Sequence, residues 1–148
     1  MRAGETHFPG LGSSKPYGAF LRNARNYARG RHIPKNHIPA DTWFLMDESG
    51  QKILGAVNIR CGLNEELLVR GGHIGYSVAP SERRKGYATE QLRLALEKCR
   101  AMGLGLVLIT CDKGNIGSAR VIQKNGGVLE DERILDGIVF QRYWVEPR

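Results

Sequence analysis

The chain has 148 residues, of which 41% are hydrophobic and 25% charged, a composition that favours one soluble globular domain with one core. No apolar run approaches the ~20 residues needed to span a bilayer, and residues 1–18 lack the apolar stretch of a secretory signal. The net charge of +7 instead predicts anionic partners, such as nucleic acid, an acidic protein or a phosphorylated cofactor.

The N-terminal third is predicted to hold one helix between two irregular segments. Residues 1–15 are rich in Gly, Ser and Pro, and we expect a poorly ordered tail there. From Pro16 to about Arg29, apolar residues recur every three or four positions, which predicts an amphipathic helix that ends at Gly30. The two prolines within residues 31–42 favour an extended loop.

Three strands are predicted next. Trp43–Met46 and Lys52–Arg60 flank a four-residue turn that ends in glycine, so we expect an antiparallel hairpin. After a loop that ends in Gly71-Gly72, apolar residues alternate with small or polar ones along His73–Val78, which is typical of a strand.

The second half alternates helices and strands. Residues 87–102 form the clearest amphipathic helix, and Leu106–Ile109 is a wholly apolar run expected to be a strand covered on both faces. Residues 115–125 predict a short helix, and two strands should follow around Asp136-Gly137. This order predicts one α/β domain over 1–148, with a crossover helix between two neighbouring parallel strands.

The cysteines point to a reducing compartment. Cys61, Cys99 and Cys111 are odd in number and form no C-x-x-C pair. This argues against a disulfide framework and against a zinc site, so we expect a cytoplasmic protein without a metal. Cys111, at a strand end, is expected to be a buried apolar residue rather than a nucleophile.

A basic turn precedes the clearest helix. Arg83, Arg84 and Lys85 stand before Gly86, at the point where a helix start leaves backbone N–H groups unpaired. Such a start binds phosphate readily, and three cations suit a diphosphate. Considered alone, the same pattern is also that of a solvated basic turn.

Two motifs in register resemble the GNAT acetyltransferases. Arg83-x-x-Gly86-x-Ala88 is similar to the signature by which that family holds the pyrophosphate of coenzyme A. Asn115 to Gly126 is similar to a segment of members that acetylate protein α-amino groups. The resemblance covers roughly residues 43–148. It implies a mixed, mostly antiparallel central sheet with a splayed parallel pair and flanking helices.

The resemblance also implies a cofactor site for acetyl-coenzyme A (acetyl-CoA). The backbone of one strand would pair with the pantetheine arm, a turn would hold the pyrophosphate, and a helix start would lie near the sulfur. The residues implied are Tyr76, Val78, Arg83, Arg84, Lys85, Gly86, Tyr87, Ala88, Thr89, Asn115 and Ser118.

The expected reaction is direct transfer of an acetyl group to a primary amine on a small molecule or peptide. A backbone N–H near Tyr76 or Ser77 would hold the oxyanion. Protein N-termini, amino acids, polyamines and aminoglycosides all remain open as acceptors. One alternative is a basic nucleic-acid-binding domain, which ranks lower because interleaved aromatic residues are absent from the sequence. Another alternative is a regulator that binds coenzyme A without catalysis.

The sequence departs from the family at the catalytic groups. Ile122 stands where many members have a tyrosine acid, so Ser118 is the substitute, although it could simply be a capping residue. His73 is a candidate base, or else a hydrogen-bonded histidine at a strand end. Glu65 and Glu66 are the other candidate bases, and both could equally be solvated loop acids.

Further departures lie at the edges of the resemblance. Gly127 replaces a common phenylalanine, and the family's first strand has no counterpart before Pro16. Either the sheet is one strand shorter or a partner, such as a second copy in a homodimer, covers that edge. Three arginines on the first helix could attract an acidic acceptor, but a solvated face is the favoured interpretation; they are Arg22, Arg25 and Arg29.

Overall fold

The computed structural model describes residues 17–148, so the tail expected over 1–15 lies outside the described residues. In chain order the elements are α1 Tyr17–Arg29, β1 Ala40–Met46, β2 Ile53–Arg60, α2 Glu65–Val69, β3 Ile74–Val78, a 3₁₀ turn Pro80–Glu82, α3 Tyr87–Ala101, β4 Val107–Asp112, α4 Ile116–Lys124, β5 Val128–Leu135 and β6 Ile138–Val145.

The predicted helices and strands are all present, with shifted ends. β1 begins at Ala40 rather than Trp43, and β4 continues to Asp112 rather than stopping at Ile109. The helix α2 was not predicted, because five residues are too few to show a helical period. A cap stabilises it, since the Asn64 side chain accepts a hydrogen bond from the Leu67 amide at 2.8 Å.

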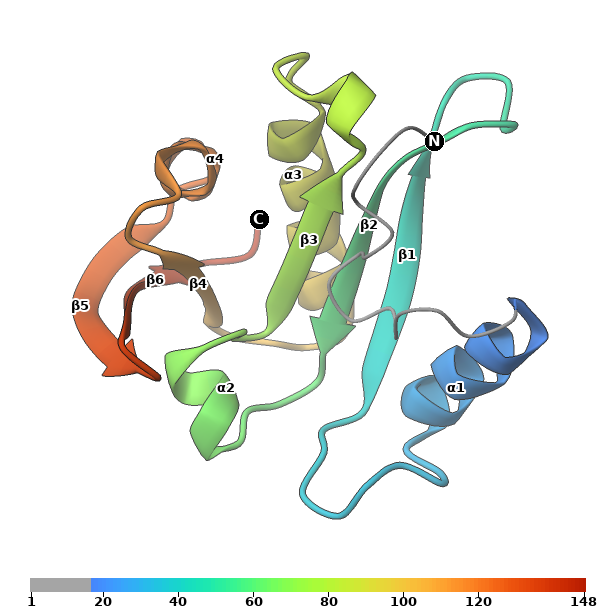
Figure 1. The fold of residues 1–148 in the computed structure, drawn as a ribbon, viewed down its shortest axis with the longest axis horizontal. Helices are drawn as coiled ribbons and strands as arrows, with labels where there is room; N and C mark the ends of the chain where they lie inside the picture. The colour runs from blue at the N-terminus through green and yellow to red at the C-terminus, as the bar shows by residue number, and fades with distance from the viewer. Residues whose placement is uncertain (1–16) are drawn as a thin grey trace.

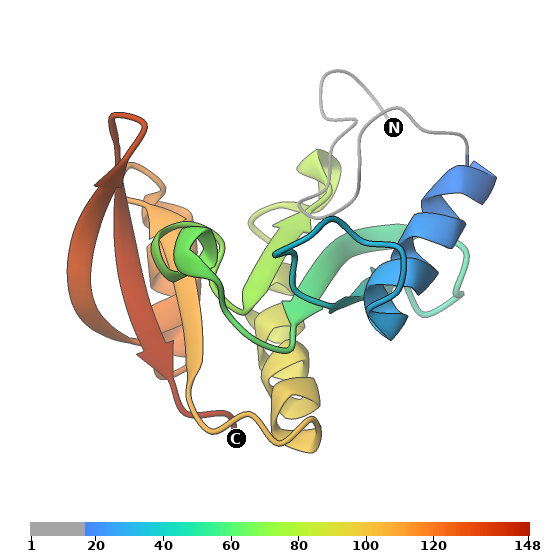
Figure 2. The same cartoon turned by 90° about the horizontal axis from the view of Figure 1, so that it is seen from below.

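The strands form two separate antiparallel sheets, ordered β1-β2-β3 and β4-β6-β5. The crossover helix α3 joins the last strand of the first sheet to the first strand of the second. β3 and β4 lie close together at their starts and diverge toward their ends (Figures 1 and 2). The expected fold class, with its splayed pair, is therefore confirmed. The divergence is large enough to divide the sheet in two.

A short junction joins the two sheets where β3 and β4 begin. The His73 amide donates to the Leu108 carbonyl at 2.7 Å, and the Leu108 amide donates to His73 Nδ1 at 2.9 Å. The preceding Gly72 has φ +58°, and a Cβ on it would lie 2.3 Å from the Leu108 carbonyl oxygen. Only glycine allows this approach, so the junction requires it.

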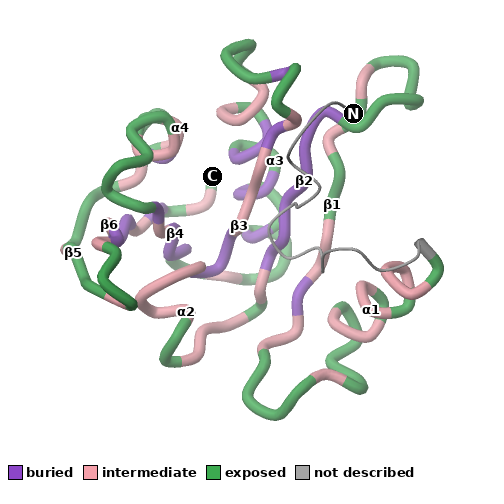
Figure 3. The backbone as a smooth tube through the Cα atoms, viewed as in Figure 1, coloured by how far each residue is buried: buried purple, intermediate pink, exposed green. Residues whose placement is uncertain are grey.

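The central strand β2 is buried on both faces (Figure 3). Val57 and Ile59 point toward α3 and join the main hydrophobic core. Asn58 and Ala56 point to the opposite face, where α1 lies against β1 and the rings of Phe20 and Phe44 meet edge to face at 6.4 Å. α3 thus covers one face of the first sheet, whereas α1 packs against the outer strand β1 (Figure 1).

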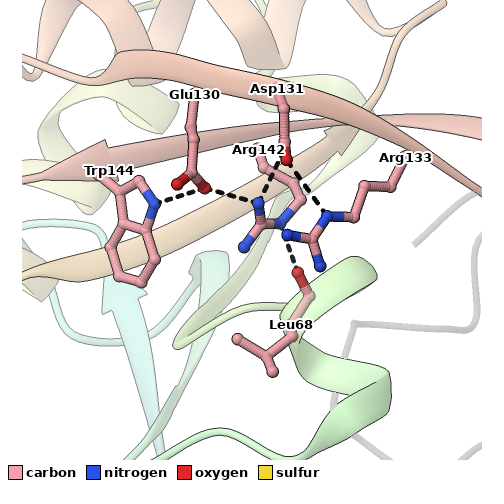
Figure 4. A network of polar contacts seen from close by, with 6 residues as sticks. All are labelled: Leu68, Glu130, Asp131, Arg133, Arg142 and Trp144. Carbon is pink, nitrogen blue, oxygen red and sulfur yellow. Dashed lines mark hydrogen bonds and ion pairs between the residues drawn. The ribbon is translucent and has the colours of Figure 1, made fainter.

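Arg142 on β6 connects the second sheet to α2 (Figure 4). Its side chain is 2% exposed and pairs with Glu130 at 2.6 Å and with Asp131 at 2.7 Å. Its Nε donates to the Leu68 carbonyl at 2.5 Å. A register shift between Leu129 and Asp131 in β5 allows the two consecutive acids to reach the same guanidinium. A buried cation therefore fixes the position of α2.

We expect Arg142→Ala to lower the free energy of unfolding by about 3 kcal/mol, because it removes a buried cation from its partners. Arg133→Ala is the matched control, since Arg133 pairs with the same Asp131 at 3.3 Å on the exposed surface. The control should cost less than ~1 kcal/mol. Urea denaturation of the two variants measures both values, and equal losses would contradict this role of Arg142.

Candidate functional site

The turn after β3 presents a row of unpaired backbone donors. Gly86 caps α3 with φ +84°, and Arg84 also has a positive φ of +62°. Within the described chain, the amides of residues 84–89 donate to no carbonyl or side chain, and the first helical bond is that of Glu90 to the Gly86 carbonyl at 3.2 Å. These amides lie at the positive end of a 15-residue helix. Such a row of donors at a helix start favours an anion.

A cavity of about 740 Å³ opens beside this turn, between β3, α3 and α4. It brings together almost the whole set of cofactor residues expected from the sequence. The lining residues are Tyr76, Ser77, Val78, Glu82, Arg83, Arg84, Gly86, Tyr87, Ala88, Thr89, Asn115, Gly117, Ser118, Arg120, Val121 and Lys124. Arg120 and Lys124 on α4 are two further cations that the sequence analysis missed, although both stand inside the quoted second motif.

Lys85 is the one expected cofactor residue that does not line the cavity. Its Nζ lies 2.9 Å from Glu82, which also pairs with Lys52. Together the two lysines lower the pKa of Glu82 to about 2, with the Lys52 hydrogen bond as the largest cause. Glu82 thus remains ionised and is neutralised by two ammonium groups, so it does not oppose an anion in the cavity.

The edge of β3 that faces the divergence carries free backbone groups. The His73 carbonyl accepts from Arg60 and the Ala79 amide donates to Leu54, so these two residues pair with β2. Backbone groups of alternate residues point to opposite neighbours in a strand. The backbone N–H and C=O groups of Tyr76 and Val78 therefore point away from β2, toward the space between the two sheets. This is the side on which the resemblance implies a cofactor arm.

Tyr76 and Ser118 meet across that space. The Tyr76 phenol lies 2.8 Å from Ser118 Oγ, and burial raises the pKa of Tyr76 to about 12. Because the phenol stays protonated, it can donate to Ser118. The Asn115 side chain accepts from the Ser118 amide at 3.1 Å and caps α4, so the serine is held by its main chain while its hydroxyl faces the cavity.

His73 has a structural position. It is 7% exposed, does not line the cavity beside α3, and its Nδ1 accepts from the Leu108 amide. Burial, with a smaller contribution from the nearby Arg60 charge, lowers the pKa of His73. Since Nδ1 is an acceptor, the ring proton of the neutral form sits on Nε2. Neither ring nitrogen is then free to take a proton. This argues that His73 is a hydrogen-bonded histidine at a strand end rather than a catalytic base.

Two departures from the family are in contact with each other. Ile122 is fully buried in the core, and a Cβ on Gly127 would lie 2.4 Å from the Ile122 Cγ2. The branched side chain at 122 thus fills the space that a side chain at 127 would need.

Cys111 is buried as well, and burial, more than the nearby Asp112 charge, raises the pKa of its thiol to about 11. A protonated thiol at neutral pH is a poor nucleophile.

A second cavity, of about 380 Å³, lies on the opposite face of the first sheet. Its walls come from α1, the loop after it, β1, β2 and α2. The lining residues are Phe20, Asn23, Ala24, Tyr27, His37, Ile38, Ala40, Thr42, Asn58, Arg60, Asn64, Glu66 and Leu67. Of the two candidate acids only Glu66 lines it, and its carboxylate pairs with Arg70 at 2.7 Å.

The three arginines of α1 were expected to face solvent. Arg22, Arg25 and Arg29 are exposed and line neither cavity.

Comparison with known proteins agrees with this geometry. Residues 16–128 match the family model described as acetyltransferase (GNAT) domain. The chain belongs to the GNAT acetyltransferase family. The match also covers α1, which lies before the 43–148 segment on which the resemblance was based.

Individual relatives are more distant. Over 87 residues the chain is 34% identical to GCN5-related N-acetyltransferase 6, chloroplastic, of Arabidopsis thaliana, which covers 57% of this chain but only 30% of the plant protein. Ribosomal-protein-S5-alanine acetyltransferase from Vibrio fischeri superposes with a TM-score of 0.65 at 18% identity, over 88% of this chain and 69% of that one. The yncA protein of Salmonella typhimurium, solved with its cofactor acetyl-CoA, gives 0.62 at 10% identity over 92% and 76%. At these identities the solved structures show a shared fold.

Within residues 17–148, no helix has the length and apolar character to cross a bilayer. No cluster of three or more His, Cys, Asp or Glu side chains there is placed to hold a metal ion.

The position of His73 predicts a pH effect on stability. Because its pKa is lower in the folded chain than the ordinary value near 6.5, protonation favours unfolding, and stability should fall as the pH drops below about 6.5. His73→Asn keeps an acceptor oxygen near the Nδ1 position but does not titrate. Urea denaturation between pH 7.5 and 5.5 should therefore show a smaller loss in the variant. Parallel losses would contradict the buried neutral state.

Proposed function

We propose that this protein transfers an acetyl group from acetyl-CoA to a primary amine, by direct attack in a ternary complex. The proposal depends mainly on the backbone amides of residues 84–89, which donate no hydrogen bond within the described chain. These amides border a large cavity between two diverging strands. A ligand with a diphosphate and an extended amide arm fits that arrangement. Family membership and a relative that binds acetyl-CoA support the same donor.

In this proposal each cofactor residue has a distinct task. The amides of residues 84–89, with Arg83 and Arg84, hold the pyrophosphate. The Tyr76 carbonyl and the outward backbone groups of Val78 pair with the pantetheine arm as a neighbouring strand would. Asn115 contacts the pantetheine end nearest α4. Arg120 and Lys124 on the opposite wall add positive charge for the remaining phosphate.

The chemistry follows from the groups at the inner end of the cavity. The amine nitrogen bonds to the thioester carbonyl carbon, the Tyr76 amide donates to the carbonyl oxygen as it gains negative charge, and the carbon–sulfur bond then breaks. Ser118 donates the proton that the departing thiolate takes. Ser118 then regains a proton from water, while the Tyr76 phenol donates a hydrogen bond to the serine oxygen. The serine thus takes the place of the tyrosine that is missing at position 122.

The proton of the attacking amine must also leave. Among the bases expected from the sequence, His73 has its Nδ1 occupied and Glu65 lines neither cavity. Glu66 lines the second cavity, which opens on the face of the sheet opposite α3. We therefore assign this proton to water, with Glu66 as the remaining candidate among the acids expected from the sequence.

Replacing Gly86 tests cofactor binding. Gly86→Glu should abolish the rise in melting temperature that acetyl-CoA produces, because it places a carboxylate where the phosphates belong. Gly50→Glu is the matched control: Gly50 also has a positive φ, of +70°, and nothing lies within 4 Å of its Cβ position. Both variants carry similar backbone strain, but only the control should retain the shift and a micromolar dissociation constant. If wild-type protein shows no shift at millimolar acetyl-CoA, the proposal fails.

The two alternatives give different outcomes. A coenzyme A-binding regulator would show the shift but release no free thiol across a broad amine panel. A nucleic-acid-binding domain would bind duplexes with a steep salt dependence and without any cofactor effect. Mass identification of acetylated products in the thiol-release assay supports the transferase.

Replacing Ser118 tests the proton donor. We expect Ser118→Ala to lower kcat at least about tenfold with little change in the KM for acetyl-CoA, because it removes a group that acts as the thiolate leaves. Tyr76→Phe should lower kcat less, since the serine hydroxyl remains. Cys111→Ala should retain turnover, because direct transfer needs no enzyme nucleophile. Loss of activity in the Cys111 variant would indicate a covalent intermediate and overturn direct attack.

A further inference from the structure

The wall of the second cavity contains a half-buried cation that the proposed chemistry does not use. Arg60 ends β2 and lines the cavity, and its backbone amide pairs with the His73 carbonyl at 2.8 Å. Its Nη1 donates to the carbonyls of Gly71 at 2.9 Å and Gly72 at 3.1 Å. A guanidinium has five N–H donors, so Nε and Nη2 retain three without a partner in the described chain.

No carboxylate of the described residues neutralises Arg60. It takes part in no ion pair, and burial alone lowers the pKa of its guanidinium. Glu66, on the cavity wall, makes its ion pair with Arg70 and its side chain is 63% exposed. Elsewhere this fold pairs its buried charges, as Arg142 and Glu82 show. A half-buried cation without a countercharge is partly removed from water at a cost in stability, so one that borders a cavity points to an anionic ligand.

The other walls define the rest of that ligand. Phe20, Ile38 and Leu67 supply apolar surface. Asn58 and Asn64 also line the cavity, but their NH₂ groups already donate to Thr42 and to the Asn36 carbonyl. The cavity does not favour a polycation, because its single carboxylate, that of Glu66, is already paired with Arg70. The walls therefore suit an apolar stem that ends in a carboxylate, for which a guanidinium is the preferred partner.

The cavity lies within reach of the site proposed for the thioester. Val57 is opposite Tyr76 in the ladder, and Arg60 is three residues further along β2, about 10 Å at ~3.3 Å per residue. Asn58, on the face of the sheet that carries the second cavity, pairs with Gly75. Because Gly75 has no side chain, nothing on β3 blocks this face next to Tyr76. A short ligand anchored at Arg60 could thus bring its other end to the diverging strands.

We infer that the acceptor is an amine that carries a carboxylate, and that Arg60 binds this carboxylate in the second cavity. The inference rests on the proposed function for the amine and on the cavity itself for the carboxylate. It excludes polyamines from the preferred acceptors.

The test compares amines that differ only at the far end. Acetyl transfer is measured for 6-aminohexanoate, 6-aminohexanamide and 1,6-diaminohexane, with shorter and longer members of each series. We expect kcat/KM for the carboxylate to exceed that of the amide at least about tenfold at the best length, and the diamine to be poorest. Arg60→Gln, which keeps donors for the two glycine carbonyls but lacks the charge, should remove the difference.

A second pair of variants keeps the test decisive if Arg60→Gln does not fold. Asn23 lines the cavity from α1, whereas Asn26 on the same helix does not. Asn23→Asp should reduce the carboxylate preference at least about threefold by placing a like charge in the cavity. Asn26→Asp makes the same change outside it and should leave the preference intact.

Binding of hexanoate, which has no amine, separates the two proposals. Calorimetry should show saturable binding to wild-type protein that is weakened by Asn23→Asp. Hexanoate binding without any acetyl transfer would overturn the proposed function and leave the anion site standing. Acetyl transfer with equal rates for carboxylate and amide, or faster transfer to the diamine, would overturn the inference and leave the transferase.

Discussion

The junction between His73 and Leu108 is the constraint on which the cavity beside α3 depends. Two hydrogen bonds hold β3 to β4 where the strands begin, and beyond that point the strands separate. The separation leaves Tyr76 and Val78 with free backbone groups, and the chain then turns into α3 with its amides unpaired. One side of the opened sheet can thus receive a cofactor arm. The other face, bordered by α1 and α2, carries the cavity of Arg60.

The treatment of buried charge separates scaffold from site. Glu82 has two lysines and Arg142 has two acids together with the Leu68 carbonyl, so these groups stabilise a turn and a helix. Arg60 has backbone carbonyls alone. The unpaired amides at 84–89 are the corresponding case in the main chain. Both unsatisfied features border cavities, where a ligand of opposite charge can complete them.

The sequence predicts local structure well, including the turn before α3, because it depends on short-range patterns. The period of residues 87–102, the glycine at 86 and the cap at Asn115 are each decided by neighbours in the chain. The roles of His73 and Arg60 depend on pairing across strands. A histidine whose Nδ1 meets the Leu108 amide, 35 positions away, looks in the sequence like a candidate base. Arg60 looks like an ordinary polar end to a strand.

The close contact at Gly72 gives the molecule an adjustable dimension. With no Cβ, residue 72 lets the Leu108 carbonyl approach to a distance that a single methyl group would forbid. A larger residue there would overlap that carbonyl and push the starts of β3 and β4 apart. Because Tyr76 lies on β3 and Ser118 follows β4, the spacing of these two hydroxyl groups depends in part on the missing side chain at residue 72.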